Sequence, residues 1–352
     1  MLPASLVTSL TSKADIGLEN AIPLRQRTTT SGVRYGCASA APSVQPDITL
    51  LDKIRTEANI FVPEGSLKWI VTEPQPGQFD FLQGDSIAVF ARRNGMLVHG
   101  HTLVWHAAIP TWVSQLVAPA SARMALGRHI GTLVSRYKGL IWAWDVVNEA
   151  IEPDDGIDYG YRNSPWYHCL GADYIDLAFR LARDADSKPP LCLSEYGLEY
   201  QTLASKRRRS ALLSLLRHLR TQGTPIDCLA LQSHLSADQV LDQDGLTSFL
   251  RQVVALGYRL AITELDVNDA KIPGTIEARD RIVEAHVSDY LDLVFSVARP
   301  ISIATWGLSD RYTWLRQYYS RDDGTALRPL PLDVNLRRKP MWSALARFIS
   351  AP

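Results

Sequence analysis

The chain has 352 residues, with 37 Lys or Arg against 37 Asp or Glu, so its formal net charge is zero. This balance excludes a large non-specific nucleic-acid footprint and gives no reason to expect an anionic membrane as a partner. Hydrophobic residues make up 46% of the chain, but no apolar run reaches the roughly 18 residues of a membrane span.

The first 32 residues contain few signals of regular structure. Met1 to Leu10 is weakly apolar but has neither a basic n-region nor a convincing cleavage site. The run from Gln26 to Gly32 (QRTTTSG) is typical of a linker. We therefore expect residues 1–32 to form an extension or linker and residues 33–350 to form one domain.

From residue 33 onward, short apolar runs alternate with amphipathic stretches that have helical spacing. The predicted strands are Val33–Ala38, Ile60–Val62, Met96–Val104, Trp142–Val147, Leu191–Ser194, Cys228–Gln232, Leu260–Thr263 and Ile301–Trp306. The predicted helices are Thr49–Glu57, Gly84–Asn94, Ser121–Arg136, Ala172–Asp186, Ser205–Gln222, Gly245–Leu256 and Ile276–Ala298. The basic run Lys206–Arg209 lies in one of these helices, and we expect it to form a solvated outer face.

Strands that alternate with helices in this way indicate a parallel sheet. An open doubly wound sheet would be expected to carry a glycine-rich phosphate turn, and neither GxGxxG nor GxxxxGK occurs in the chain. The sequence therefore predicts a single-domain α/β protein with the (β/α)8 TIM-barrel fold.

Active groups of such barrels lie at the carboxyl ends of the strands. Glu149 closes the fourth predicted strand and Glu264 closes the seventh, so the two carboxylates face each other across the mouth. Two carboxylates that flank a bond are what glycoside hydrolysis requires. Either Glu by itself is more often part of a structural ion pair, but the two at opposite strand ends favour catalysis.

Three further residues support this interpretation. His234, itself held by Asp266, is expected to keep Glu264 ionised and oriented. Asn148 is expected to donate a hydrogen bond to a sugar hydroxyl. A histidine such as His234, taken alone, is more often a satisfied core residue.

Two other functions fit parts of the same pattern. His99 and His101 resemble the HxH ligands of metal-dependent amidohydrolases, but that motif normally lies on the first strand and needs a lysine that the fourth strand lacks. A barrel that binds carbohydrate without cleaving it is the other alternative. Such a protein would have no need of both glutamates together with their supporting residues.

Four motifs in order resemble glycoside hydrolase family 10, the endo-β-1,4-xylanases: GHTLVWH (100–106), WDVVNEA (144–150), LQSHL (231–235) and ITELDV (262–267). The resemblance runs from about Val33 to Ile349. It implies a retaining mechanism with Glu149 as acid/base and Glu264 as nucleophile, their carboxyl groups about 5–5.5 Å apart. It further implies xylan or xylo-oligosaccharides as substrate, no cofactor and no metal, a monomer, and a secreted or periplasmic location.

The resemblance also assigns expected substrate contacts. The sugar being cleaved would meet His101, Asn148, Gln232 and His234, with Trp306 and Trp314 above it and Tyr196 beneath it. The adjoining glycone sugar would meet Glu64, Lys68 and Trp105. Cys192 and Cys228 begin two strands that are expected to be neighbours, and some family members carry a disulfide there; whether they form one stays open.

The chain departs from the family pattern at three positions. Gly65 replaces an asparagine, Ala108 a glutamine and Gly197 another asparagine, so three side-chain amides expected on the glycone side are missing. Each lost hydrogen bond is worth roughly 0.5–1.5 kcal/mol. An alternative substrate is therefore a different short or decorated β-glycoside, cleaved by the same chemistry.

Overall fold

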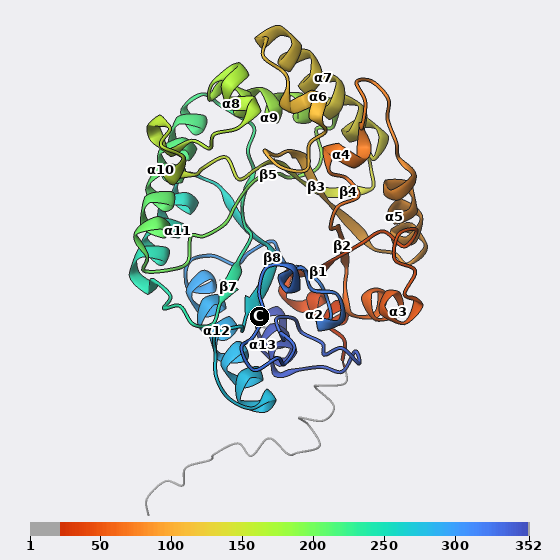
Figure 1. The fold of residues 1–352 in the computed structure, drawn as a ribbon, viewed down its shortest axis with the longest axis vertical. Coiled ribbons are helices and arrows are strands. Elements are labelled where there is room, and N and C mark those ends of the chain that lie inside the picture. The colour runs from red at the N-terminus through yellow and green to blue at the C-terminus, as the bar shows by residue number, and fades with distance from the viewer. Residues whose placement is uncertain (1–21, 351–352) are drawn as a thin grey trace, which may run out of the picture.

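A computed structural model describes residues 22–350 and confirms the barrel (Figure 1). Parallel pairing continues around the sheet from β1 to β6, and β6–β8, β8–β9 and β9–β1 pairs close it. The strands are β1 Arg34–Ser39, β2 Ile60–Pro63, β3 Leu97–Val104, β4 Ile141–Asn148, β5 Leu191–Glu195, β6 Cys228–Leu231, β7 His234–Ser236, β8 Arg259–Asn268 and β9 Ser302–Thr305. All eight predicted strands are present, and the short β7 is additional.

Helices surround the barrel, and the seven predicted ones are confirmed (Figure 1). The α-helices are α2 Leu24–Ser31, α3 Ile48–Glu57, α4 Trp69–Thr72, α5 Leu82–Arg93, α6 Thr111–Ser114, α7 Pro119–Arg136, α8 Pro165–Leu170, α9 Asp173–Ala185, α10 Leu203–Thr221, α11 Gln243–Ala255, α12 Ile276–Val297 and α13 Pro340–Ser350. Within residues 22–350, no helix combines the length and the apolar character that crossing a membrane requires.

Side-chain caps explain where several helices begin. Asp47, Thr202, Asp242 and Thr275 each accept a hydrogen bond from the backbone N–H three residues later. Such caps satisfy amide groups that have no partner inside the helix. α10 and α11 consequently begin two residues before the predicted starts, because the cap, rather than the first apolar residue, defines the first turn.

The predicted linker at Gln26–Gly32 is wrong, because Leu24–Ser31 forms helix α2. This helix packs against α13 and β1. Its backbone is tied to α3, since Leu24 N donates to the buried Glu57 carboxylate at 3.0 Å. Of the expected extension, residues 1–21 lie outside the described part of the chain.

The basic run on α10 is only half solvated, which corrects the prediction. Lys206 and Arg207 are exposed, whereas Arg208 and Arg209 are buried. Arg208 pairs with Glu152 at 2.8 Å, and Arg209 pairs with Asp242. The two buried arginines thus tie α10 to loops at the carboxyl end of the barrel.

Cys192 on β5 and Cys228 on β6 are register partners, as the prediction of neighbouring strands required. Both side chains are fully buried inside the barrel beside Ala143 and Ala230. The structure contains them as free thiols and not as a disulfide. These four residues form a small buried cluster, against which Trp142 and Ile301 pack.

Glu57 offers a test of how the N- and C-terminal helices hold each other. It is 1% exposed and accepts hydrogen bonds from Leu24 N, Arg338 Nη2 and Trp342 Nε1. Glu57→Leu removes the acceptor of the buried Leu24 N–H and Trp342 Nε1–H groups, and it also removes the ion pair with half-buried Arg338. We expect the free energy of unfolding, measured by urea denaturation, to fall by about 3–5 kcal/mol.

The matched control is Asp52→Ala in the same helix. Asp52 pairs with Arg55 at a site where both side chains are at least half exposed, so the change should cost less than about 1 kcal/mol. Equal losses of unfolding free energy in the two variants would show that the buried network around Glu57 stabilises the fold no more than an exposed ion pair does.

Candidate active site

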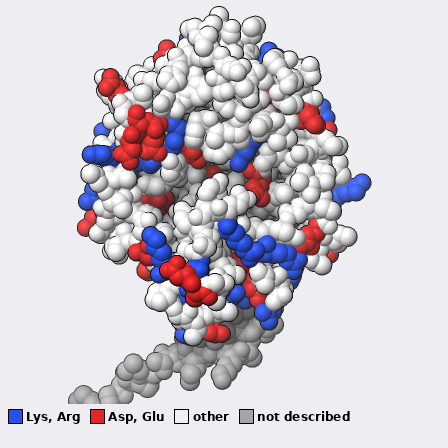
Figure 2. Space-filling view, in the orientation of Figure 1, with Lys and Arg blue, Asp and Glu red and all other residues white. Residues whose placement is uncertain are grey.

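A cavity of about 790 Å³ opens at the carboxyl ends of the strands. Figure 2 shows the hollow, with acidic and basic side chains in its walls. Glu149 and Glu264 both line it, and so do ten of the other residues predicted for the site: Glu64, Lys68, His101, Trp105, Asn148, Tyr196, Gln232, His234, Trp306 and Trp314. Asp266 lies behind His234 and borders a neighbouring cavity.

Glu149 follows the last residue of β4 and has a left-handed backbone conformation, with φ 58°. Its Oε2 accepts a hydrogen bond from Trp105 Nε1 at 2.8 Å. Its Oε1 accepts from Gln232 Nε2 at 3.1 Å and from Asn148 Nδ2 at 3.3 Å. Donors from β4 and from the ends of β3 and β6 therefore orient this carboxylate.

Glu264 lies on β8 and is 4% exposed. His234 Nε2 lies 3.2 Å from its Oε2, and His234 Nδ1 lies 2.9 Å from Asp266 Oδ1. Burial by itself would lower the pKa of His234, but Asp266 and then Glu264 raise this pKa to about 10. The protonated ring donates to both carboxylates and so fixes the position of the Glu264 side chain.

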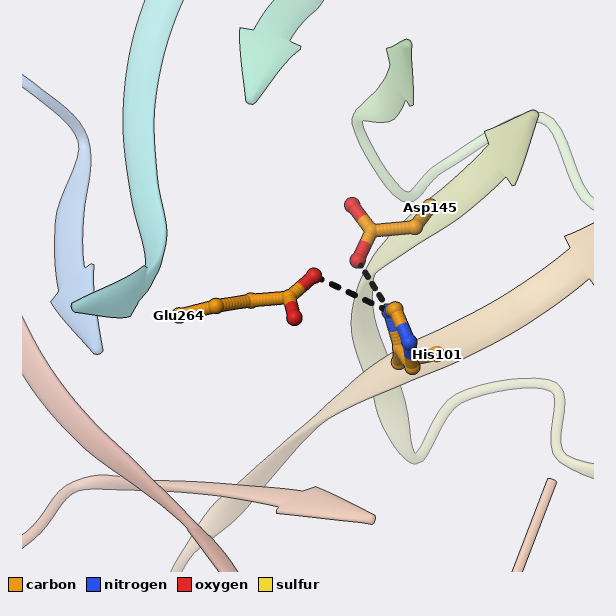
Figure 3. Close-up of side chains that lie close together, drawn as sticks. All are labelled: His101, Asp145 and Glu264. Atoms are coloured by element: carbon orange, nitrogen blue, oxygen red, sulfur yellow. Dashed lines mark hydrogen bonds and ion pairs between the residues drawn. The ribbon is translucent and has the colours of Figure 1, made fainter. Parts of the chain in front are cut away.

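Buried side chains on β3 and β4 approach Glu264 from another side (Figure 3). His101 Nδ1 lies 2.9 Å from Asp145 Oδ2 and 3.8 Å from Glu264 Oε1. His99 Nε2 lies 2.9 Å from the other Asp145 oxygen. Burial would raise the pKa of Asp145, but the two histidines hold it well below its usual range.

Ligand atoms of His101, Asp145 and Glu264 lie within 4.8 Å of one another, close enough to hold a metal ion. Their positions have a simpler explanation, because Asp145 lies between His99 and His101 and contacts a ring nitrogen of each. The HxH pair therefore converges on a carboxylate of the neighbouring strand. This geometry favours an orienting network behind Glu264 over the amidohydrolase alternative.

The wall formed after β2 combines charged and aromatic side chains. Lys68 Nζ lies 4.7 Å from the centre of the Trp105 ring and 5.9 Å from that of Trp306. Burial lowers the pKa of Lys68, although Glu264, Glu64 and Glu149 oppose the shift. Burial likewise raises the pKa of Glu64, which Lys68 opposes. This wall offers a sugar both hydrogen-bonding groups and ring faces.

Tyr196 belongs to a cluster that the sequence did not reveal. Its hydroxyl donates to Glu152 at 2.8 Å and accepts from Arg162 Nη2 at 2.9 Å, and Arg208 lies 4.2 Å from its ring centre. Arg162 and Glu152 come from the irregular β4–α8 connection, which has no periodic signal. For Arg208 the sequence did contain a signal, because Arg208 precedes Leu212 by one helical turn and so shares the buried face of α10.

The three missing amides do not lie together. Gly65 lines the catalytic cavity beside Glu64 and Lys68. Gly197 instead lines the neighbouring cavity of about 280 Å³, and Ala108 borders neither of these two cavities. Ala108 lies against the wall after β2, because its carbonyl oxygen accepts a hydrogen bond from Ile70 N at 2.9 Å. That all three losses affect the glycone side stays a prediction.

Comparisons with known proteins agree with this geometry. The profile of Glycosyl hydrolase family 10 matches residues 23–348. Endo-1,4-beta-xylanase A of Phanerodontia chrysosporium is 36% identical over 288 residues, which cover 81% of this chain and 66% of that protein. Endo-1,4-beta-xylanase 1 of Humicola insolens is 34% identical over 293 residues, which cover 82% of this chain and 65% of that protein. The chain thus spans about two thirds of the length of these relatives.

A solved structure extends the likeness to three dimensions. Xylanase 10B from Thermotoga petrophila RKU-1, crystallised in complex with xylobiose, has a TM-score of 0.84 and 28% identity, and the match covers 93% of this chain and 97% of that one.

The charge on His234 leads to a pH-dependent contribution to stability. Its pKa is about 10 in the folded protein against 6.5 for an ordinary histidine, so the folded state holds a proton that the unfolded chain releases between these values. The stabilisation is complete below pH 6.5 and disappears as the pH rises through 10. We expect the free energy of unfolding to be higher for wild type than for His234→Gln, and we expect this difference to be largest near pH 6.

Urea denaturation of both proteins at several pH values measures this difference, and shared titrations cancel in the subtraction. A difference that stayed constant from pH 6 to pH 10 would contradict the protonated state of His234.

Proposed function

The chain belongs to glycosyl hydrolase family 10, and from that membership we propose a retaining endo-β-1,4-xylanase that hydrolyses xylan or xylo-oligosaccharides by double displacement. One observation above all supports this proposal. Glu149 and Glu264 line one cavity, and each carboxylate is held by its own set of donors. The names of the xylanases that the chain resembles point to the substrate.

Glu264 is the proposed nucleophile. Protonated His234 donates to it, which aims the buried carboxylate and places a positive charge beside it. In the first step its oxygen attacks the anomeric carbon while the bond from that carbon to the leaving oxygen breaks. The product of this step is a covalent glycosyl-enzyme ester.

Glu149 is the proposed acid and base. It gives its proton to the leaving oxygen in the first step and takes a proton from the attacking water in the second. Hydrogen bonds from Trp105 and Gln232 hold the Glu149 carboxylate in place. Water then opens the ester, and the sugar keeps its original anomeric configuration.

The proposed location follows from the substrate. A polymer such as xylan does not cross a membrane, so we propose a secreted or periplasmic enzyme that acts as a monomer. We further propose that residues 33–350 form the catalytic domain, with residues 1–32 as an N-terminal extension, part of which packs as α2.

A second candidate substrate is a short or decorated β-glycoside. The open space at Gly65 favours it, because no atom lies within 4 Å of where a Cβ would stand. The chemistry would be the same. The wild-type product pattern on xylan, xylo-oligosaccharides and aryl β-xylosides separates the two candidates.

Substitution of each glutamate tests the proposed roles. Glu264→Gln should lose turnover on every substrate. Glu149→Ala should lose most activity on xylan but much less on a dinitrophenyl β-xyloside, because that leaving group needs no protonation. Reducing-sugar release and aryl-group absorbance measure the rates, and NMR of the first products reports the anomer.

The matched control is Glu277→Gln, which changes an exposed glutamate on α12 and should leave the rates unchanged. The assigned roles would be wrong if Glu264→Gln kept turnover, and retention would be wrong if the α-anomer formed first. Binding of xylo-oligosaccharide without turnover by wild type would favour the non-catalytic alternative.

Restoring one amide tests the effect of its loss. Gly65→Asn introduces a side chain into open space, at a backbone conformation that other residues adopt readily. One added hydrogen bond should lower KM for xylotriose by about 2- to 12-fold with little change in kcat. An unchanged KM would show that position 65 does not contact the substrate.

A further inference from the structure

Two adjacent tyrosines lie in the wall of the catalytic cavity without a role in the reaction. Tyr318 and Tyr319 follow a short helical turn, Trp314–Gln317, in the long β9–α13 connection (blue in Figure 1). Their exposed fractions are 67% and 45%. Both line the cavity that contains Glu149 and Glu264. No sequence motif pointed to them.

The backbone and one neighbouring ring hold these tyrosines in position. The backbone N–H groups of Tyr318 and Tyr319 both donate to Leu315 O, at 3.1 and 2.9 Å. The Tyr318 ring stands edge-on to Trp314, with 5.3 Å between ring centres. Trp314 is fixed in turn, because its Nε1 donates to Asp266 Oδ2 at 2.6 Å. The aromatic group therefore rests on the network that orients Glu264.

The chain just beyond the tyrosines is anchored as well. The Arg321 side chain is 4% exposed and pairs with Asp323 at 2.9 Å. Its Nη1 donates to the carbonyl oxygens of Asp269 and Ile272, in the β8–α12 loop. This buried arginine joins the β9–α13 connection to the β8–α12 loop and so keeps this part of the connection from moving away from the cavity. The backbone that carries the two tyrosines is thus fixed at the edge of the cavity.

Tyr319 also marks where the cavity continues. It lines both the catalytic cavity and the neighbouring cavity of about 280 Å³, and so do Tyr196, His234 and Trp314. A sugar chain that leaves the catalytic centre along this wall therefore meets the exposed tyrosine rings. Aromatic rings held in this way bind the apolar C–H face of a pyranose with little loss of side-chain entropy.

We propose that Tyr318 and Tyr319 form a stacking platform for a further pyranose ring of the substrate chain, beyond the sugars at the bond that is cleaved. This inference rests on the proposed glycosidase function. A ring face contacts carbon-bound hydrogens and does not read individual hydroxyl groups. The platform would therefore strengthen binding of long chains while tolerating substituents that amide side chains would discriminate against.

Binding to an inactive protein separates this inference from the proposed activity. In the full chain carrying Glu264→Gln, xylohexaose and xylobiose are titrated by calorimetry, with and without Tyr318→Ala and Tyr319→Ala. We expect the double change to weaken xylohexaose binding by about 3- to 30-fold and xylobiose binding much less. Tyr318→Phe with Tyr319→Phe should keep the affinity, because the ring and not the hydroxyl is used.

Tyr159→Ala is the matched control, since this tyrosine is 82% exposed but does not line either cavity. Thermal unfolding of each variant checks that the fold is intact. Unchanged xylohexaose affinity, or equal losses for both sugars, would overturn the platform while wild-type turnover leaves the proposed function standing. Wild type without turnover, but with ring-dependent xylohexaose binding, would overturn the function and keep the platform.

Discussion

The charge of a carboxylate buried inside the barrel is the constraint on which the site depends. Glu264 is 4% exposed, and an ionised group at such a depth is strongly unfavourable unless donors compensate for lost water. His234 supplies the compensation, since Asp266 keeps it protonated and its second nitrogen faces Glu264. Trp314 donates to the other oxygen of Asp266. The network thus requires β7, β8 and the β9–α13 connection to be in place together.

This requirement explains a departure from the predicted strands. The seventh strand was expected to end at Thr263, whereas β8 continues to Asn268. The extra residues pair with β7, in a register that sets His234 opposite Asp266. The strand extends beyond the closed part of the barrel, and this extension places His234 next to Asp266, the carboxylate that keeps the histidine charged.

Trp314 connects the network around Glu264 to the tyrosines at the edge of the cavity. Trp314 stabilises Asp266 through its nitrogen and packs against Tyr318 through its ring. On the opposite side, Lys68 lies close to the Trp105 and Trp306 rings, next to a glycine where the family usually has an amide. The balance between aromatic and polar contacts is thus shifted toward ring faces.

The sequence by itself determined the barrel, its eight strands and the two glutamates, because alternating apolar periods and strand-end residues are local patterns that a parallel barrel brings to one face. Tertiary structure alone decided the rest. α2 is helical where its composition is that of a linker, since it packs against α3 and α13 and its Leu24 is fully buried. Arg208 is buried in a run that looked solvated, because burial depends on segments distant in sequence, here the loop that carries Glu152. Tyr318 and Tyr319 line the cavity because the fold of the β9–α13 connection brings them there, which no local pattern predicts.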